Sequence, residues 1–518
     1  MRYGFSSPSA GEYKVVIFLK AVLKTKIWVL FILCSIGNTD ALAEPASPVV
    51  DTGQARCYDN SKEISCPEPG NPFFGQDARY EGNAPSYIDN GDGTVSDLQT
   101  SLMWSKAVDA NKVSLDEAVK IAQQMTLGGY SDWRVPNIKE LYSLIDFRGY
   151  TGFSGRSHGG RVPANAIPFI NTDYFDFEYG NVDAGERYID AQWLSRTKYV
   201  STTMGGMETL FGVNFADGRI KGYGYKRPGE QRVRKKFYVR YVRGNAYGKN
   251  SFVDNGDGTI TDRATGLMWM QKDSGKSINW QEALLYAQRL RHAGYDDWRL
   301  PNAKELQYIV NYSLSPDTTN SPAADPVFET SAVINEAGQN DYPYFWTSTT
   351  HLDGPDPGKN AVYISFGRAL GKMHGRIMDV HGAGAQRSDP KIGSPTSRGP
   401  QGDMIRVYNY VRCVRGGAVK TISSLPSTDR NKYPNNIRKY SGVSQTGPRG
   451  SVGRPGPSHG RPSFVERLDI NGDGRVSRSE FDGPVDRFDI HDVNRDGYLT
   501  EDEAPKGPPP GHRRPQRQ

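Results

Sequence analysis

The sequence is poor in the residues that most often carry catalysis or bind metals. Its 518 residues include only four cysteines and eight histidines. None of the histidines begins a His-Glu-x-x-His motif or has metal-ligand spacing, and no phosphate-binding loop is present. We therefore predict that the protein is not an enzyme. The formal charge of +6 is small for this length and favours no nucleic-acid partner.

Long apolar runs are also scarce. One run covers residues 27–37, and Ala41-Leu42-Ala43 follows it with the small residues of a cleavage site. The basic residues before it are Lys14, Lys20, Lys24 and Lys26. This order predicts a signal peptide at residues 1–43, with an uncleaved anchor as the alternative, since the run is short for a membrane span. We expect a secreted, cell-surface or periplasmic protein with no stable membrane span after cleavage.

Removal of this segment leaves three cysteines. Cys57 and Cys66 flank a short polar loop, and export implies an oxidising compartment. We predict that these two form a disulfide. Cys413 is left over, and we expect it to be buried on a strand. Residues 44–86 are then a disulfide-stapled lead-in, expected to pack on the repeat that follows it.

A long repeat organises the rest of the chain. The motif Asp-Asn-Gly-Asp-Gly-Thr begins at Asp89 and again at Asp254, which is 165 residues later. Leu-Met-Trp and Asp-Trp-Arg recur at the same offset. Residues 87–105 and 252–270 are identical at 11 of 19 positions. Because a solenoid repeat is far shorter, we predict two tandem copies of one domain, at residues 87–244 and 251–417.

Each copy begins with a hairpin signal. An Asn-Gly-Asp-Gly turn lies between short β-prone segments, as in Tyr87-Ile88 and Thr94-Val95-Ser96. The alternative is a calcium loop, which the acidic residues allow. A bidentate glutamate at the right spacing is missing, however, so we favour the hairpin turn.

Two helices follow in each copy, and each has a capping-box signal. The expected boxes are Ser114 with Glu117, Asn137 with Glu140, Asn279 with Glu282, and Asn302 with Glu305. Long, poorly periodic stretches come next, at residues 148–198 and 311–344, and strands resume after them. We align residues 199–202 with residues 345–348. This element order predicts α+β domains, and we place ligand contacts in the long loops that differ between the copies.

The Asp-Trp-Arg motifs allow two interpretations. Trp133 and Trp298 could form a ligand platform, since tryptophan stacks on sugars and arginine pairs with anions. Alternatively, each tryptophan is a core residue, and an Asp–Arg pair fixes the turn before a helix. We favour the core, because the motifs lie beside helix-start signals and change little between the copies.

The last hundred residues carry the strongest chemical signal. Residues 418–462 form a Pro-, Gly- and Arg-rich linker and residues 505–518 a similar tail, both expected to be disordered. Between them, residues 463–504 hold two 12-residue loops with oxygen donors at the EF-hand spacing. A degenerate acidic loop is the alternative. The predicted Ca²⁺ ligands are Asp469, Asn471, Asp473, Arg475, Ser477, Glu480, Asp492, Asn494, Asp496, Tyr498, Thr500 and Glu503. Val476 and Leu499 suit the short β-contact between paired loops.

The repeated motifs resemble a bacterial domain family typified by the C-terminal domain of the Legionella collagen-like adhesin. That family carries the aspartate-rich hairpin, Gly-Leu-Met-Trp, Asp-Trp-Arg-Leu-Pro-Asn and a closing Val-Arg-Cys-Val-Arg strand. The first copy departs from it at Ser101, Val135 and Tyr241. The resemblance implies a distant C-type-lectin-like fold and an adhesion or carbohydrate-recognition role, above all toward sulfated or acidic glycans.

We therefore expect two tandem C-type-lectin-like α+β domains and a small all-α EF-hand pair. The expected partner is a polysaccharide or cell-surface ligand. The basic runs at residues 232–236 and at Arg513-Arg514 could favour an anionic one, although a solvated charge run is the commoner explanation. Two copies would raise avidity if both sites can be reached. Two alternatives remain: a structural envelope protein ordered by calcium, or an oxidase of the formylglycine-generating type. The oxidase chemistry uses paired cysteines, and Cys413 has no partner in its repeat.

Overall fold

The computed structural model describes residues 47–108, 111–153, 161–398 and 401–422. It also describes short pieces near the C-terminus, at 465, 474–478, 481, 488, 491–494, 496–500 and 502–503. The predicted signal peptide, most of the linker and the tail lie outside these residues. The chain forms two compact units, residues 1–442 and 443–518. Within the described part, no helix is long and apolar enough to cross a membrane.

A four-stranded antiparallel sheet opens each copy. Across each sheet, the closing strand of the copy lies beside its third strand, and the second and first strands follow. Gly91 and Gly93 have positive φ angles, and Asp92 Oδ1 accepts hydrogen bonds from Thr94 N and Oγ1. The predicted hairpin turns are confirmed in both copies. The strands are β4 (Tyr87–Asp89), β5 (Thr94–Asp97), β6 (Leu102–Ser105) and β10 (Val242–Arg243), then β11 (Phe252–Asp254), β12 (Thr259–Asp262), β13 (Leu267–Met270) and β23 (Val414–Gly416).

All four predicted capping boxes are present. In each, the side chain of the N-cap residue accepts a hydrogen bond from the glutamate backbone, and the glutamate carboxylate accepts one from the N-cap backbone. The boxes begin the helices where the sequence placed them. The helices are α1 (Leu115–Gln124), α2 (Ile138–Ser143), α3 (Trp280–Arg289) and α4 (Ala303–Tyr308).

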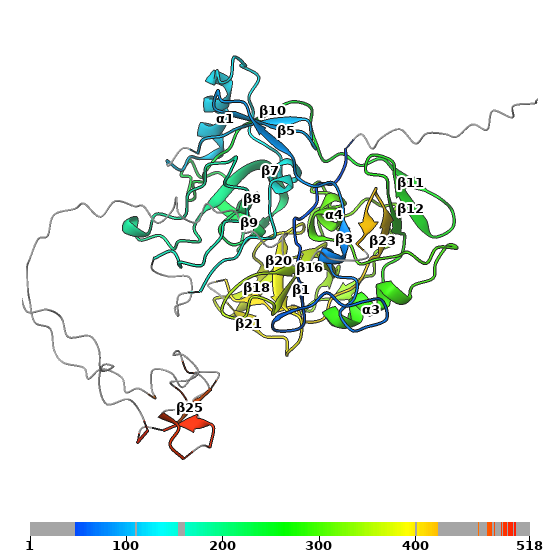
Figure 1. The fold of residues 1–518 in the computed structure, drawn as a ribbon. Helices are drawn as coiled ribbons and strands as arrows, with labels where there is room; N and C mark the ends of the chain where they lie inside the picture. The colour runs from blue at the N-terminus through cyan, green and yellow to red at the C-terminus, as the bar shows by residue number, and fades with distance from the viewer. Residues whose placement is uncertain are drawn as a thin grey trace, which may run out of the picture. The chain divides into compact units, whose positions relative to one another are not determined.

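The two copies share one six-stranded sheet (Figure 1). Its order is β16-β17-β20-β9-β8-β7, so the three strands of copy 2 mirror those of copy 1. The halves meet where Ile220 of β9 pairs with Gln386 of β20, here called the copy junction. The strands are β7 (Gln192–Thr203), β8 (Met207–Asn214), β9 (Arg219–Lys226), β16 (Tyr344–His351), β17 (Asn360–Ser365) and β20 (Gln386–Pro390). The copies are thus related by an approximate two-fold axis through the sheet.

One alignment made from the sequence is wrong. Trp193, and not Tyr199, is the counterpart of Phe345, because each forms a parallel bridge to the closing segment of its own copy. Strand β7 begins at Gln192, inside the stretch expected to be a loop. Trp193 is fully buried and contributes to a core. The spacing of apolar residues around it in the sequence did not indicate this burial.

The sheet has two differently covered faces. On one, α2 and α4 pack over a single core that joins both copies, through side chains such as Leu141, Phe211, Leu306 and Val362. On the other, two separate cores lie under α1 and α3 at the ends of the sheet. Each fully buried large apolar side chain stabilises by roughly 1.5–3 kcal/mol. Because one core crosses the copy junction, the copies stabilise each other.

The lead-in packs chiefly on copy 2, which corrects the expectation that it packs on the first repeat. Asp77 Oδ2 accepts from Thr349 Oγ1 at 2.5 Å, and the Gln54 side-chain amide exchanges two hydrogen bonds with the backbone of Thr350. The predicted Cys57–Cys66 disulfide is present. The lead-in elements are β1 (Cys57–Tyr58), β2 (Glu63–Ile64), η1 (Asp77–Arg79) and β3 (Tyr80–Glu81), which pairs with β24 (Lys420–Thr421).

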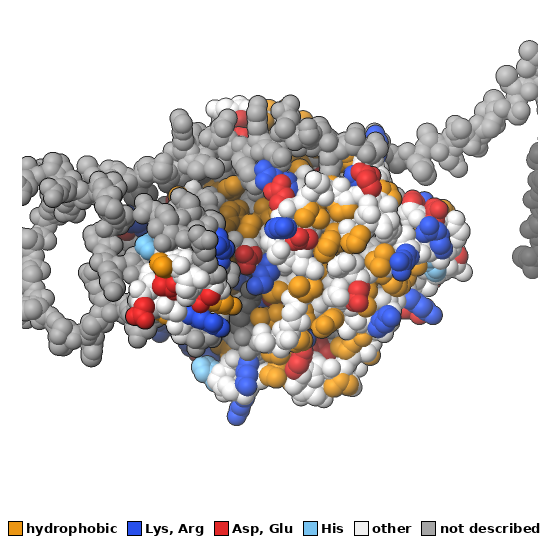
Figure 2. All heavy atoms as spheres, turned by 60° about the horizontal axis from the view of Figure 1, so that its bottom comes forward, with side chains coloured by type: hydrophobic (Ala, Val, Ile, Leu, Met, Phe, Trp, Pro, Cys, Tyr) orange, Lys and Arg blue, Asp and Glu red, His pale blue; other side chains and the backbone are white. Residues whose placement is uncertain are grey.

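Short elements complete the architecture. They are η2 (Val182–Ala184), β14 (Val333–Ile334), β15 (Asn340–Asp341), β18 (Leu370–Met373), β19 (Arg376–Asp379), β21 (Ser397–Arg398), β22 (Asp403–Met404), β25 (Val476–Ser477) and β26 (Tyr498–Leu499). The class is α+β with sheets dominant, as predicted at that coarse level. On the face drawn in Figure 2, basic and acidic side chains are intermixed with apolar ones.

Candidate functional site

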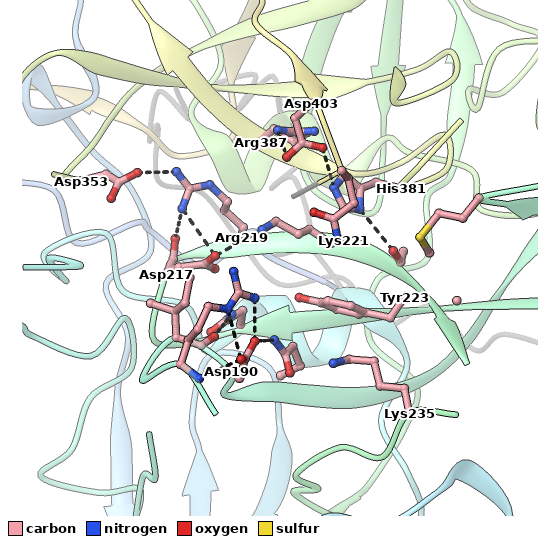
Figure 3. Close-up of a pocket in the computed structure, with 18 residues that line it drawn as sticks. Asp190, Asp217, Arg219, Lys221, Tyr223, Lys235, Asp353, His381, Arg387 and Asp403 are labelled. Atoms are coloured by element: carbon pink, nitrogen blue, oxygen red, sulfur yellow. Dashed lines mark hydrogen bonds and ion pairs between the residues drawn. The ribbon is translucent and has the colours of Figure 1, made fainter. Parts of the chain in front are cut away.

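The middle of the face that carries α1 and α3 holds a cavity of about 480 Å³, here called the junction pocket (Figure 3). Side chains alternate along a strand, so Ile220 points to the shared core while its neighbours Arg219 and Lys221 point into this pocket. Arg387 of β20 does the same from copy 2. The other lining residues include Arg187, Asp190, Asp217, Tyr223, Lys235, Asp353, His381 and Asp403. Both copies therefore build one site.

Ion pairs hold most of these charges in place. Arg219 Nη2 lies 2.6 Å from Asp353 Oδ2, and this pair joins copy 1 to copy 2. Arg387 Nη2 lies 2.8 Å from Asp403 Oδ2. Because these four side chains are nearly buried, their carboxylates and guanidiniums are screened little by solvent. The pairs fix the pocket's walls in defined positions.

Burial sets the protonation of the pocket. Burial alone would raise the pKa of Asp403, but Arg387 and His381 hold it well below its usual range. Burial lowers the pKa of His381, against the opposing effect of Asp403. Burial also lowers the pKa of Lys221. The pocket therefore presents carboxylates, cations and an imidazole together.

Some polar groups of the pocket have no protein partner. Lys235 forms no ion pair in the described part of the chain, and its ammonium lies 5.3 Å from the centroid of the Tyr223 ring. The buried Tyr223 hydroxyl, Asp217 Oδ1 and Arg387 Nε have no hydrogen-bond partner among the described residues. Buried polar atoms are normally satisfied, so these mark places where solvent or a ligand supplies the partner. The pocket suits a polar ligand that both donates and accepts hydrogen bonds.

The Asp-Trp-Arg motifs are structural, as favoured, but their ion pairs differ from the expectation. Trp133 is buried, and its indole N–H donates to the carbonyls of Leu127 and Tyr130.

Asp132 pairs with Arg243 of β10 rather than with Arg134. Arg134 instead forms two hydrogen bonds with the capping-box carboxylate of Glu140. Copy 2 repeats this arrangement, with Arg299 on Glu305.

Cys413 is a free, fully buried cysteine and lies just before β23. Burial raises the pKa of its thiol well above the usual range. Since the thiolate is the reactive form of cysteine, this raised pKa and the burial disfavour reaction at Cys413. That environment argues against the oxidase alternative.

The C-terminal unit contains parts of both predicted EF-hand loops. Val476 pairs with Leu499 in the expected β-contact. Arg475, Ser477 and the six ligands of the second loop are described. Asp469, Asn471, Asp473 and Glu480 lie outside the described residues. The β-contact is present, and calcium binding itself stays a prediction.

The donor set of the second loop fits calcium. Gly497 has a φ of +85°, as the sharp turn requires. Asp492 accepts hydrogen bonds from the N–H groups of Asp496 and Gly497, and Glu503 accepts from that of Asn494. In the described residues, no three His, Cys, Asp or Glu side chains form a metal-binding group. All the donors are hard oxygens, which Ca²⁺ prefers.

Comparison with known proteins identifies the repeats. The profile of the Lcl C-terminal domain family matches residues 93–243 and 258–380, more than half of the sequence. The chain belongs to this family. The family is adhesin-like, and together with the disulfide it favours an extracellular or envelope location and a surface ligand. No curated protein and no solved structure matches the chain.

The matches to this Lcl C-terminal family cover the pocket unequally. Arg219 and Tyr223 lie within the first match, whereas His381, Arg387 and Asp403 follow the end of the second. Sequence reasoning reached this pocket only in part, because Arg187 and Asp190 lie in the long loop 148–198 and Lys235 lies in the basic run 232–236. It did not bring these residues together with Arg387, because the charged side chains come from strands of two different copies. A further signal was the basic residues at alternate positions in 219–221, which the strand pattern could have flagged.

Proposed function

We propose that the protein is an exported, calcium-binding, adhesin-like protein whose double domain binds an envelope or extracellular polysaccharide in the junction pocket. The observation that carries this proposal is the pocket itself, with paired carboxylates and guanidiniums around unpartnered polar atoms. Sugar hydroxyls both donate and accept, so they suit such a mixed lining. The ring of Tyr223 offers a surface for the apolar face of a sugar.

One charge in the pocket favours an acidic sugar. Arg187, Arg219 and Arg387 have carboxylate partners in the protein, whereas the ammonium of Lys235 has none in the described residues. A carboxylate or sulfate group on the ligand would supply that partner. The double domain then has one composite site rather than two, so avidity from two sites on one chain is no longer part of the proposal.

Calcium has a separate, supporting role in this proposal. The EF-hand pair lies in its own unit, and its oxygen donors would hold two ions that order the loops. The predicted ligands from Asp469 to Glu480 and from Asp492 to Glu503 would supply the oxygens. Calcium loading is testable by isothermal titration of the full chain, in which we expect two sites that Glu480→Gln with Glu503→Gln weakens strongly.

A glycan array tests the binding function. The mature protein, from Glu44, is applied with and without calcium to neutral, uronic-acid and sulfated polymers. We expect binding to acidic polymers that falls about 10–100-fold in Lys235→Gln, since one charge-assisted hydrogen bond is lost. Lys236→Gln is the matched control, because Lys236 is half-exposed and pairs with Glu117 outside the pocket.

Two outcomes separate the parts of this proposal. Binding that persists in the Glu480→Gln, Glu503→Gln variant leaves the ligand site in the double domain. No binding to any polymer in either condition contradicts the polysaccharide proposal, and the calcium-ordered structural role then becomes the better one.

A further inference from the structure

A second cavity of about 590 Å³ lies on the other side of the sheet, where α2 and α4 pack. We call it the helix-side cavity. Its walls come from the start of α2, from the chain between the copies and from residues that follow α4. The lining includes Asn137, Lys139, Arg196, Thr197, Tyr247, Lys249, Asn311 and Tyr312. The walls come from both copies and from the segment that joins them.

The approximate two-fold axis gives this cavity a counterpart in the same molecule. Lys139 and Lys304 are equivalent, and their ammonium groups form reciprocal hydrogen bonds across the axis. Lys139 Nζ donates to the carbonyl of Tyr308, and Lys304 Nζ donates to the carbonyl of Ser143, the residue equivalent to Tyr308. The surroundings of α2 and α4 can therefore be compared position by position.

The counterpart of the helix-side cavity lies beside α4, and there the lead-in occupies the groove. Residues 51–54 run across it with a turn at Gly53, whose φ is +78°. Lys304 Nζ donates to the carbonyl of Asp51, and Phe147 N donates to the carbonyl of Thr52. Thr349 Oγ1 donates to Asp77 Oδ2, which comes from η1 in a later part of the lead-in. Backbone carbonyls of residues 51–52 and the carboxylate of Asp77 thus fill the groove beside α4.

In the groove beside α2, Asn250 Oδ1 accepts from Lys139 Nζ in place of the Asp51 carbonyl, but the other two donors lack a partner of this kind among the described residues. Thr197 Oγ1 accepts from Ile138 N, as Thr349 Oγ1 accepts from Ala303 N. In the described residues, however, the Thr197 hydroxyl has no acceptor. The N–H of Tyr312, the equivalent of Phe147, donates no hydrogen bond there either. The open cavity beside α2 thus corresponds to the groove that the lead-in fills beside α4.

Charge favours an acidic occupant. The residue aligned with Arg196 in copy 2 is Ser348, so copy 1 has an added cation at this wall. Arg196 and Lys249 are exposed and form no ion pair in the described part of the chain. Asp325 is the one carboxylate in the cavity lining. The wall is therefore net basic.

From these observations we propose that the helix-side cavity binds an acidic peptide segment, in the way that the lead-in binds beside α4. A backbone carbonyl of the segment accepts from Tyr312 N, and its carboxylate pairs with Arg196 or Lys249. The volume lies within the range of about 300–1,000 Å³ that is common for ligand pockets. This site is distinct from the junction pocket.

The test uses the full chain and a fluorescein-labelled octapeptide with the lead-in sequence of residues 48–55, Pro-Val-Val-Asp-Thr-Gly-Gln-Ala. Fluorescence anisotropy measures binding. We expect saturable binding that weakens at least tenfold in the double variant Arg196→Glu, Lys249→Glu, and also when Asp51 of the peptide is replaced by lysine. The control is Lys120→Glu, Arg291→Glu, which places the same charge changes on exposed residues elsewhere.

Three results would overturn the proposal: no binding at millimolar peptide, equal binding by the double variant and the control, or binding of an oligogalacturonate at this site in place of the peptide. The Lys235→Gln variant separates the two sites. Peptide binding should be unchanged in it, whatever the glycan array shows.

Discussion

The two copies share their turns, caps and buried tryptophans, yet the same ion pair has different surroundings in each. The side chain of Arg299 is 5% exposed and that of Glu305 is 2% exposed, while Arg134 on Glu140 is 24% exposed. In copy 2 the lead-in covers the pair, and Tyr80 lies under Arg299. In copy 1 the segment between the copies lies there, and Tyr247 N donates to Glu140. Segments outside the motif thus set how deeply each ion pair is buried, and so how much it contributes to the stability of its copy.

The largest test of this comparison is to separate the copies. We expect fragments 47–250 and 251–422 each to fail to unfold cooperatively, because the core under α2 and α4 is shared between them. Urea denaturation followed by near-UV circular dichroism measures this, with residues 44–442 as the control. Two fragments that each unfold cooperatively would show that the shared core is dispensable.

The next test removes one arginine from each ion pair. Arg299→Ala leaves the Glu305 carboxylate buried without its partner and should cost about 3–5 kcal/mol of unfolding free energy. Arg134→Ala should cost less, about 1–3 kcal/mol, since Arg134 is more exposed and Tyr247 N still donates to Glu140. Lys272→Ala, in an exposed pair with Glu329, is the control. Equal losses in both copies would contradict the comparison.

The pH dependence of stability sharpens the comparison where α2 and α4 meet. Burial lowers the pKa of Lys304 to about 8 from an ordinary 10.5. Stability from this lysine is therefore fully present above pH 10.5 and is lost as pH falls through 8. The change amounts to about 3 kcal/mol. We expect the unfolding free energy to rise between pH 8 and pH 10, and to rise less in Lys304→Met. Parallel pH profiles would show that Lys304 does not titrate in this range.

The smallest effect concerns the lead-in. Replacing Cys57 and Cys66 by serine should cost about 2–3 kcal/mol, because the disulfide closes a short loop in the unfolded chain. The loss should appear in copy 2, which the lead-in covers. Hydrogen exchange should rise in β16 and α3 and stay unchanged in β7 and α1. Equal increases in hydrogen exchange in both copies would show that the lead-in does not pack chiefly on copy 2.

Local structure was largely predictable from residues close in the sequence. Ser114 with Glu117 forms its capping box because the two residues are one helical turn apart. The Asp89 hairpin forms because its glycines allow the left-handed turn conformation. Asp132 shows where this reasoning ends. Its partner is Arg243, 111 residues away, and no local pattern distinguishes that arginine from Arg134.

The sequence by itself determined that two copies of one domain exist, where their turns and helices begin, which cysteines pair, and that an oxygen-rich double loop follows them. Only the tertiary structure decided that the copies form one sheet, because Ile220 and Gln386 meet through a pairing that depends on the shared core. It also decided the junction pocket and the helix-side cavity. Both lie where the two copies meet, so neither exists in a single copy.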